Sequence, residues 1–165
     1  MLADLSIKDA MTGFYNRLGY ERLACRLFEE KKKAGQDLSV MFIDMDGLKK
    51  MNDTYGHECG DYALKAITTA IDRHTGPNTL NVRMGGDEFL ILTDRLPDEK
   101  VEQLLKEIEE EIPFTEEVQH LPYSPGISVG YIHTDMTNPK NLDDYVREAD
   151  EFMYEVKVKK GTARK

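Results

Sequence analysis

The chain has 165 residues, of which 40% are hydrophobic and 32% are charged, and its formal net charge is −9. This length suffices for one domain with a complete hydrophobic core, so we expect a single domain over residues 1–165. The acidic charge argues against binding a nucleic-acid polymer, which needs a basic surface. A mononucleotide remains compatible, because a metal ion can neutralise its phosphates locally.

Hydrophobic runs, cysteine spacing and the first residues of the sequence indicate the cellular location that we expect. No apolar run is long enough to span a bilayer and no signal-peptide pattern is present, so we expect no membrane contact by this segment. Cys25 and Cys59 lack motif spacing, which is typical of free thiols in a reducing cytoplasm. The abrupt start at Met1, followed almost at once by a helix, leads us to expect the C-terminal output domain of a longer regulatory protein, cytoplasmic in location.

Hydrophobic periodicity predicts helices alternating with strands. Asn16 is expected to cap the first helix. For residues 113–124 we expect either an irregular segment that crosses the molecule or an edge strand. Strands alternating with helices indicate an α/β (α+β) sandwich, with an acidic site at one edge of the sheet. Helices are predicted at about 16–33, 47–54, 59–74, 101–112 and 142–156, and strands at 38–44, in a hairpin at 80–93, and at 126–133.

Two aspartates end the first predicted strand, in the run Asp44-Met45-Asp46. Because side chains alternate along a strand, Asp44 and Asp46 lie on one face. Carboxylates at the end of a buried strand are costly unless a cation meets them, which predicts a metal ion at Asp44. Alternatively, Asp46 caps the helix that starts near Gly47, with Lys49 or Lys50 as a surface partner. Both interpretations can hold together.

A second acidic pair lies in the hairpin at 80–93, where Gly85 and Gly86 precede Asp87 and Glu88. The glycines are expected to adopt positive φ and to let a bulky ligand approach the backbone. Paired carboxylates beside bare backbone suit a hard cation that carries phosphate, with Asp87 joining Asp44. The competing interpretation is a hairpin with a solvated acidic tip.

Five ordered blocks of sequence resemble the GGDEF family of diguanylate cyclases, and the similarity covers nearly the whole chain. The blocks are D-A-M-T-G-F-Y-N-R at 9–17, D-M-D-G-L-K-K-M-N-D with Y-G-H and G-D at 44–61, G-G-D-E-F at 85–89, S-V-G at 128–130, and the stretch 149–157. The resemblance implies a palm-like fold with a mostly antiparallel central sheet flanked by helices, as in nucleotide cyclases and polymerases.

The resemblance also implies a reaction. Two GTP give cyclic di-GMP and two pyrophosphates when the 3′-hydroxyl of one GTP attacks the α-phosphate of the other. Each domain holds one GTP, so a second copy of the domain is an expected partner. The expected cofactor is Mg²⁺, two ions per site, with Mn²⁺ as an alternative.

Roles for individual residues follow from the matching positions. Asp44 and Asp87 match the side-chain metal ligands, and the carbonyl of Met45 completes the set. Asp87 also matches the proposed proton acceptor, and Lys49 a lysine at the phosphates, where a fixed cation stabilises growing negative charge. The alternative for Lys49 is a surface lysine on a short helix. The substrate-binding set further includes Gly85, Gly86, Glu88 and Lys157.

Three positions match the family's contacts to the nucleotide base. Asp61 can accept from guanine N1–H and the 2-amino group, which adenine lacks, and Asn52 can donate or accept at the same edge. His57 also matches a position at the nucleotide. The alternatives are a helix-end cap for Asn52 and a packed loop residue for His57.

The sequence departs from the family in two places. Gly76 and Thr79 occupy the positions of the R-x-x-D product-inhibition motif, so that inhibitory site is absent. Gly161 stands where an arginine is expected; Lys159, Lys160 or Arg164 could replace its charge, but none is bidentate in the same place. The expected function is an active diguanylate cyclase, and the alternative is a catalytically weak or inactive GTP-binding regulatory module.

Overall fold

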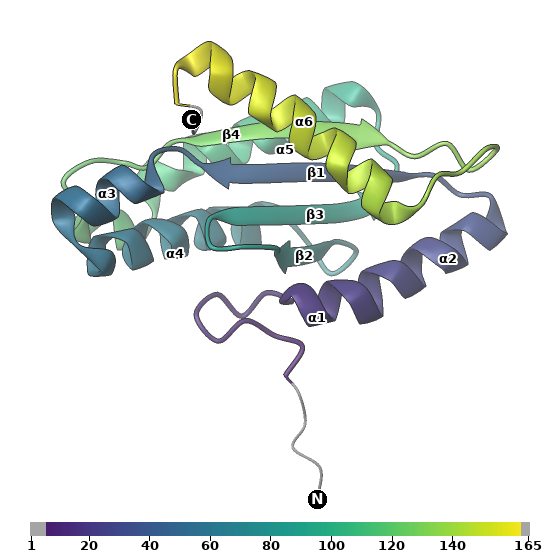
Figure 1. The fold of residues 1–165 in the computed structure, drawn as a ribbon, viewed down its shortest axis with the longest axis horizontal. Helices are drawn as coiled ribbons and strands as arrows, with labels where there is room; N and C mark the ends of the chain where they lie inside the picture. The colour runs from purple at the N-terminus through teal and green to yellow at the C-terminus, as the bar shows by residue number, and fades with distance from the viewer. Residues whose placement is uncertain (1–5, 163–165) are drawn as a thin grey trace, which may run out of the picture.

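A computed structural model describes residues 6–162, and its centre is a sheet of four antiparallel strands (Figure 1). The strand order is β2-β3-β1-β4, so β1 and β3 are internal. The mostly antiparallel sheet flanked by helices is confirmed. The strands are β1 Leu38–Met45, β2 Leu80–Arg83, β3 Glu88–Asp94 and β4 Ile127–His133.

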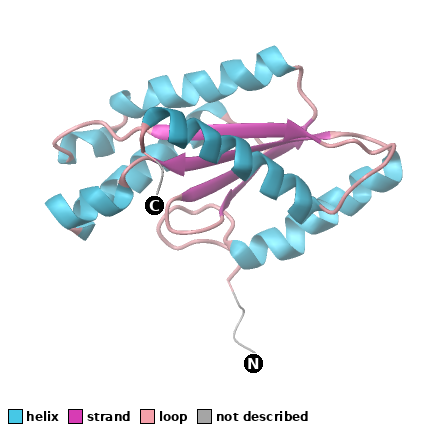
Figure 2. Cartoon of the chain, turned by 45° about the horizontal axis from the view of Figure 1, so that its top comes forward, coloured by secondary structure: helices cyan, strands magenta, loops and turns pink. Residues whose placement is uncertain are grey.

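Helices cover both faces of this sheet (Figures 1 and 2). The first predicted helix is observed as α1 Arg17–Gly19, the π-type segment η1 Tyr20–Ala24 and α2 Cys25–Ala34 in direct succession. The predicted cap is confirmed, because the side chain of Asn16 accepts a hydrogen bond from Gly19 N at 2.9 Å. The remaining helices are α3 Leu48–Tyr55, α4 His57–His74, α5 Asp98–Glu111 and α6 Leu142–Lys160.

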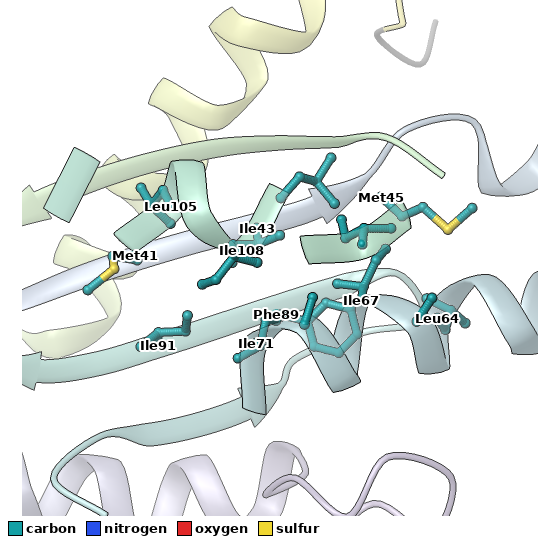
Figure 3. Close-up of a cluster of buried hydrophobic side chains, with 14 of the residues drawn as sticks. Met41, Ile43, Met45, Leu64, Ile67, Ile71, Phe89, Ile91, Leu105 and Ile108 are labelled. Carbon is teal, nitrogen blue, oxygen red and sulfur yellow. The ribbon is translucent and has the colours of Figure 1, made fainter. Parts of the chain in front are cut away.

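Strand β1 is buried on both of its faces, which explains why its sequence is a continuous apolar run rather than an alternating one. Met41 and Ile43 point into the core formed with α4 and α5, where they meet residues such as Ile67 (Figure 3). Val40 and Phe42 pack on the opposite side, against α2 and α6. The strand therefore carries its last residues to the end of the sheet on a rigid support.

Residues 113–124 contain no strand, so the predicted edge strand is wrong and the irregular crossing holds. Two short 3-10 helices occupy the segment, η2 Ile112–Phe114 and η3 Glu116–His120. Pro113 lacks an N–H group to give to a ladder, and η3 packs against α4 rather than extending the sheet.

Helix α6 lies directly on the backbone of β4, because Gly130 has no side chain to hold it away. A Cβ atom at Gly130 would be 2.3 Å from Met153 N and 2.4 Å from Ala149 O. This close packing sets the position of Lys157, one turn further along α6. Among the described residues, no helix has the length and apolar character needed to cross a bilayer.

Candidate functional site

Three carboxylates converge where β1 ends and β3 begins. Asp44 and Glu88 are opposite each other across the two strands, and Asp87 lies in the preceding turn. Met45 N donates to Asp87 O at 3.0 Å, which holds the turn against β1. One oxygen from each carboxylate lies within 4.8 Å of the others. This oxygen-rich set suits a divalent cation, and it lies at the ends of internal strands rather than at an edge of the sheet.

Burial makes it unfavourable for the neighbouring carboxylates of this cluster to be ionised together. Asp44 is 7% exposed and Asp87 3%. Desolvation by burial, followed by the nearby charge of Asp87, raises the pKa of Asp44 to about 7, against the opposing effect of Lys157. The Oδ1 atom of Asp44 is buried and has no hydrogen-bond partner among the described residues. A metal ion would satisfy this acceptor and offset the charge, so the residues present fit one.

Lys157 supplies the positive charge within the cluster. Its ammonium group is buried, 3.0 Å from the carbonyl oxygen of Met45 and 3.3 Å from Asp44 Oδ2. The predicted substrate-binding lysine therefore lies among the predicted metal ligands. The Met45 carbonyl, predicted to bind metal, accepts a hydrogen bond from this lysine in the structure.

Asp46 does not cap the following helix, so that interpretation is wrong. The cap position is Gly47, with φ 69° and no side-chain cap. Asp46 instead accepts a hydrogen bond from Ser128 Oγ at 2.7 Å and forms an ion pair with Lys160 at 3.3 Å. The hydroxyl of β4 and the ammonium groups of α6 hold its carboxylate there, and neither Lys49 nor Lys50 is its partner.

A pocket of about 470 Å³ lies between the start of α3 and the end of α6. Its charged lining residues are three lysines and one aspartate, and Lys157 also belongs to the adjoining carboxylate cluster; they are Lys49, Lys50, Lys157 and Asp53. Such a pocket suits a polyphosphate. Lys50 was not among the predicted site residues; its place beside Lys49, on the same short helix, was the available signal.

The missing arginine concerns this same pocket, because Gly161 lines it. Lys160 does not replace the arginine, since its ammonium group contacts Asp46 and the carbonyl of Ile127. Lys159 lines a different groove, on the other side of α6. Arg164 lies outside the described residues.

The predicted nucleotide-contacting residues lie on two consecutive helices, Asn52 on α3 and His57 and Asp61 on α4. His57 and Asp61 are exposed, so His57 is not a packed loop residue. The Oδ1 atom of Asn52 is buried and has no partner among the described residues, so its side chain does not act as a cap. Gly60 makes room for it, because a Cβ atom there would lie 1.8 Å from this oxygen.

The glycine turn differs from expectation, because neither Gly85 nor Gly86 has positive φ. A Cβ atom at Gly86 would meet nothing within 4 Å, so open space for a ligand is what this position offers. Arg83 holds the turn: its guanidinium donates to the Gly86 carbonyl at 2.7 Å and to Asp9 at 3.2 Å. Sequence reasoning missed this support, although Asp9 opens the first family block.

Comparison with known families agrees with this geometry. The family described as "Diguanylate cyclase, GGDEF domain" matches residues 6–163. The chain belongs to the GGDEF family. Probable diguanylate cyclase DgcJ of Escherichia coli (strain K12) is 32% identical over 158 residues, which cover 95% of this GGDEF domain and 30% of the relative.

Two further proteins are similar to this chain. Cyclic di-GMP phosphodiesterase NbdA of Pseudomonas aeruginosa is 29% identical over 132 residues, 78% of this domain and 17% of that protein. The GGDEF domain of DgcB from Caulobacter crescentus, solved in complex with c-di-GMP, has the same fold, with a TM-score of 0.84, 23% identity and coverage of 99% and 96%. The chain spans less than half the length of the curated relatives named here.

Ionisation of Asp44 should control how strongly metal stabilises the GGDEF domain. The pKa of Asp44, about 7 in the folded protein, lies above the ordinary aspartate value of 3.8. A bound proton therefore stabilises the fold below pH 7, and this contribution is lost as pH rises through 7. Metal binds the charged form, whose share rises from about a tenth at pH 6 to about nine tenths at pH 8. The Mg²⁺-induced rise in melting temperature should therefore be larger at pH 8. The same rise at both pH values would contradict this, and Asp44→Asn should abolish the difference.

Gly60→Ala should displace the side chain of Asn52 while leaving the GGDEF fold intact. The new methyl group would lie 1.8 Å from Asn52 Oδ1, and the end of this side chain can rotate away. We expect GTP affinity, measured by calorimetry with Ca²⁺ replacing Mg²⁺, to fall about tenfold, the equivalent of one lost hydrogen bond. Asp72→Ala, which raises helix propensity at an exposed position of the same helix, is the control for a change in backbone propensity. Unchanged GTP affinity in Gly60→Ala would remove Asn52 from the binding site.

Proposed function

We propose that this GGDEF domain condenses two GTP into cyclic di-GMP and two pyrophosphates, with two copies of the domain facing each other. The observation that carries the proposal is the convergence of Asp44, Asp87 and Glu88 beside a lysine-lined pocket. In-line phosphoryl transfer depends on positioning and on stabilisation of charge more than on covalent help from the protein. Carboxylates for a cation and lysines for phosphate meet both requirements.

Asp44 and Asp87 would hold the divalent cations, two Mg²⁺ or Mn²⁺, with Glu88 and the Met45 carbonyl beside them. When bound, the ions supply Lewis-acid charge, which neutralises the triphosphate and acidifies the attacking hydroxyl. Asp87 accepts the proton of the 3′-hydroxyl of one GTP. The 3′-oxygen then forms a bond to the α-phosphorus of the other GTP. The bond between that α-phosphorus and the oxygen bridging to the β-phosphate breaks, and pyrophosphate leaves. The same step in the opposite direction between the two nucleotides releases the second pyrophosphate and closes the ring. Lys49 and Lys157 stabilise the negative charge that grows on the phosphates.

The test is incubation of the protein with GTP and Mg²⁺, followed by chromatographic and mass-spectrometric detection of cyclic di-GMP. Because two domains must meet, the rate per mole of protein should rise with protein concentration. Asp44→Asn serves as the inactive comparison. Absence of cyclic di-GMP at every protein concentration, with GTP binding retained, would overturn the proposal.

A GTP-binding regulatory module is the second candidate function. The position of Gly161 in the lysine-lined pocket favours it, because the pocket lacks a bidentate phosphate ligand there. The similarity to NbdA, which is named as a cyclic di-GMP phosphodiesterase rather than as a cyclase, is compatible with this second function. Tight GTP binding by calorimetry, together with no turnover, would select this function.

Cyclic di-GMP should not inhibit the domain from a site upstream of the glycine turn. Gly76 and Thr79 cannot supply the arginine and aspartate of such a site, and Thr79 Oγ1 is committed to the Gly76 carbonyl at 2.8 Å. A product titration of the initial rate at saturating GTP should show weak competitive inhibition or none. Strong non-competitive inhibition at low product concentration would refute this prediction.

A further inference from the structure

The sheet has an open edge at β4. Strand β1 pairs with one side of β4, and within residues 6–162 no strand pairs with the other side. Successive residues of a strand point their backbone N–H and C=O groups to opposite sides. Because Thr134 N donates to Leu38 O at 2.9 Å, the even-numbered residues of β4 direct these groups toward β1. The backbone N–H and C=O groups of Val129 and Tyr131 therefore point outward, where they can receive another strand.

This edge lies in a groove of about 580 Å³ that residues of α5 and α6 line. Leu105 of α5 and Val156 of α6 line its two sides, and Phe152, also in the lining, is 49% exposed. Proteins ordinarily cover an open strand edge or blunt it with charge, and a large exposed apolar patch marks an interaction site. The groove thus combines unpaired backbone with apolar walls on both faces of the sheet.

Side-chain contacts are made at both ends of β4. At one end the ammonium group of Lys160 contacts the carbonyl of Ile127. At the other, the ring of His133 lies between Ser39 Oγ at 2.9 Å and Asp98 Oδ1 at 2.6 Å. The stretch between these contacts is 128–132, enough for one short strand.

The rim of the groove is acidic. Lys106 lies 3.9 Å from Glu110, and Glu102 accepts a hydrogen bond from the Tyr131 hydroxyl at 3.0 Å. Glu109 and Glu155 have no ion-pair partner in the part of the chain that the structure describes, so the rim attracts a basic ligand. Its charged residues are Glu102, Glu109, Glu110, Glu155, Lys106 and Lys159.

We propose that this groove binds an extended segment of a partner protein, which pairs with β4 as a fifth strand. The segment carries apolar side chains at its centre, between α5 and α6, and lysine or arginine at its ends, facing the acidic rim. Backbone hydrogen bonds to Val129 and Tyr131 provide affinity, and the walls and the rim provide specificity. A second copy of this chain would place the same acidic rim against this one, so the charge selects a basic partner.

A synthetic peptide tests the proposal without nucleotide, and therefore independently of catalysis. The probe is fluorescein-labelled Lys-Arg-Val-Thr-Val-Val-Arg-Lys-amide, followed by fluorescence anisotropy. We expect saturable binding and slower amide hydrogen exchange at Val129 and Tyr131. The same peptide with N-methyl groups on alternate central residues, in both possible registers, should bind at least about tenfold more weakly, because it lacks the donors for the ladder.

Two protein variants separate the charge of the rim from the backbone ladder. Glu109→Lys combined with Glu155→Lys should weaken peptide binding about tenfold, whereas Glu99→Lys with Glu151→Lys, on the same helices outside the groove, should not. Val129→Pro removes an outward N–H and leaves the bonds to β1, so it should weaken binding while circular dichroism stays unchanged. The proposal fails if the probe does not bind saturably, if both double variants bind it equally, or if the protein self-associates through this edge in sedimentation.

Discussion

Asp87→Asn should abolish cyclic di-GMP formation and leave the fold intact. Asp87 is 3% exposed and lies within the carboxylate cluster. The substitution removes the proposed metal ligand and the proposed proton acceptor together. The loss of a group that acts in the transition state commonly costs a hundredfold to ten-thousandfold in rate. Because the amide retains the size of the carboxylate, and its main chain still accepts from Met45 N, the turn should keep its shape.

The measurement is the initial rate of product formation at saturating GTP and Mg²⁺, with melting temperature and circular dichroism recorded in parallel. Asp94→Asn is the matched control: it neutralises an exposed carboxylate at the far end of β3, the strand that follows Asp87, where the partner is Lys31. Turnover in Asp87→Asn close to that of the parent protein would dismiss the assigned role. Loss of turnover in both variants would show that net charge, rather than the site, is responsible.

The sequence predicted strand β1 and the following hairpin correctly, because the pattern of apolar residues in a strand depends directly on which of its faces are buried. The run at 38–44 is apolar on both faces, and the structure buries every residue of β1. The glycine pair between two apolar stretches predicted the hairpin that brings Asp87 to Asp44. Both are local signals whose consequences stay within one or two strands, so no knowledge of the tertiary fold was needed.

Lys157 shows what local patterns leave out. A lysine near the end of a helix is ordinarily solvated, and its placement over Asp44 depends on how α6 crosses the sheet. The signal was present but ambiguous: Ala149, Met153 and Lys157 are spaced four residues apart, so the lysine lies on the buried row of the helix. The crossing itself depends on the bare backbone of Gly130 in another element.

Asp46 and the glycine turn were misinterpreted for a related reason. A short polar side chain before a helix predicts a cap, but Ser128 and Lys160, distant in sequence, hold the carboxylate of Asp46. Two adjacent glycines predict positive φ, but Arg83 holds the turn through the carbonyl of Gly86 without it. In both cases long-range or side-chain hydrogen bonds override a preference worth about 1 kcal/mol.

Guanine selectivity should rest mainly on Asp61, with Asn52. Asp61 is exposed in the structure, so a bound base would cover it and pair its carboxylate with N1–H and the 2-amino group. ATP has no N1–H donor, and its N1 lone pair would face the same carboxylate. Hydrogen bonds to a charged group contribute about 1.5–3 kcal/mol each. At the lower end of that range, two of them give a preference for GTP over ATP of about a hundredfold.

Asp61→Ser should relax this preference to about tenfold or less, because it removes both the acceptor pair and the charge that repels adenine. Competition between GTP and ATP, measured by calorimetry with Ca²⁺ in place of Mg²⁺, reads affinity without turnover. Asp72→Ser, an exposed position further along the same helix, is the matched control and should keep the parent preference. Equal affinity of the parent protein for the two nucleotides would show that Asp61 is an ordinary surface residue of α4. A preference that survives Asp61→Ser would instead place guanine recognition on Asn52 and its neighbours.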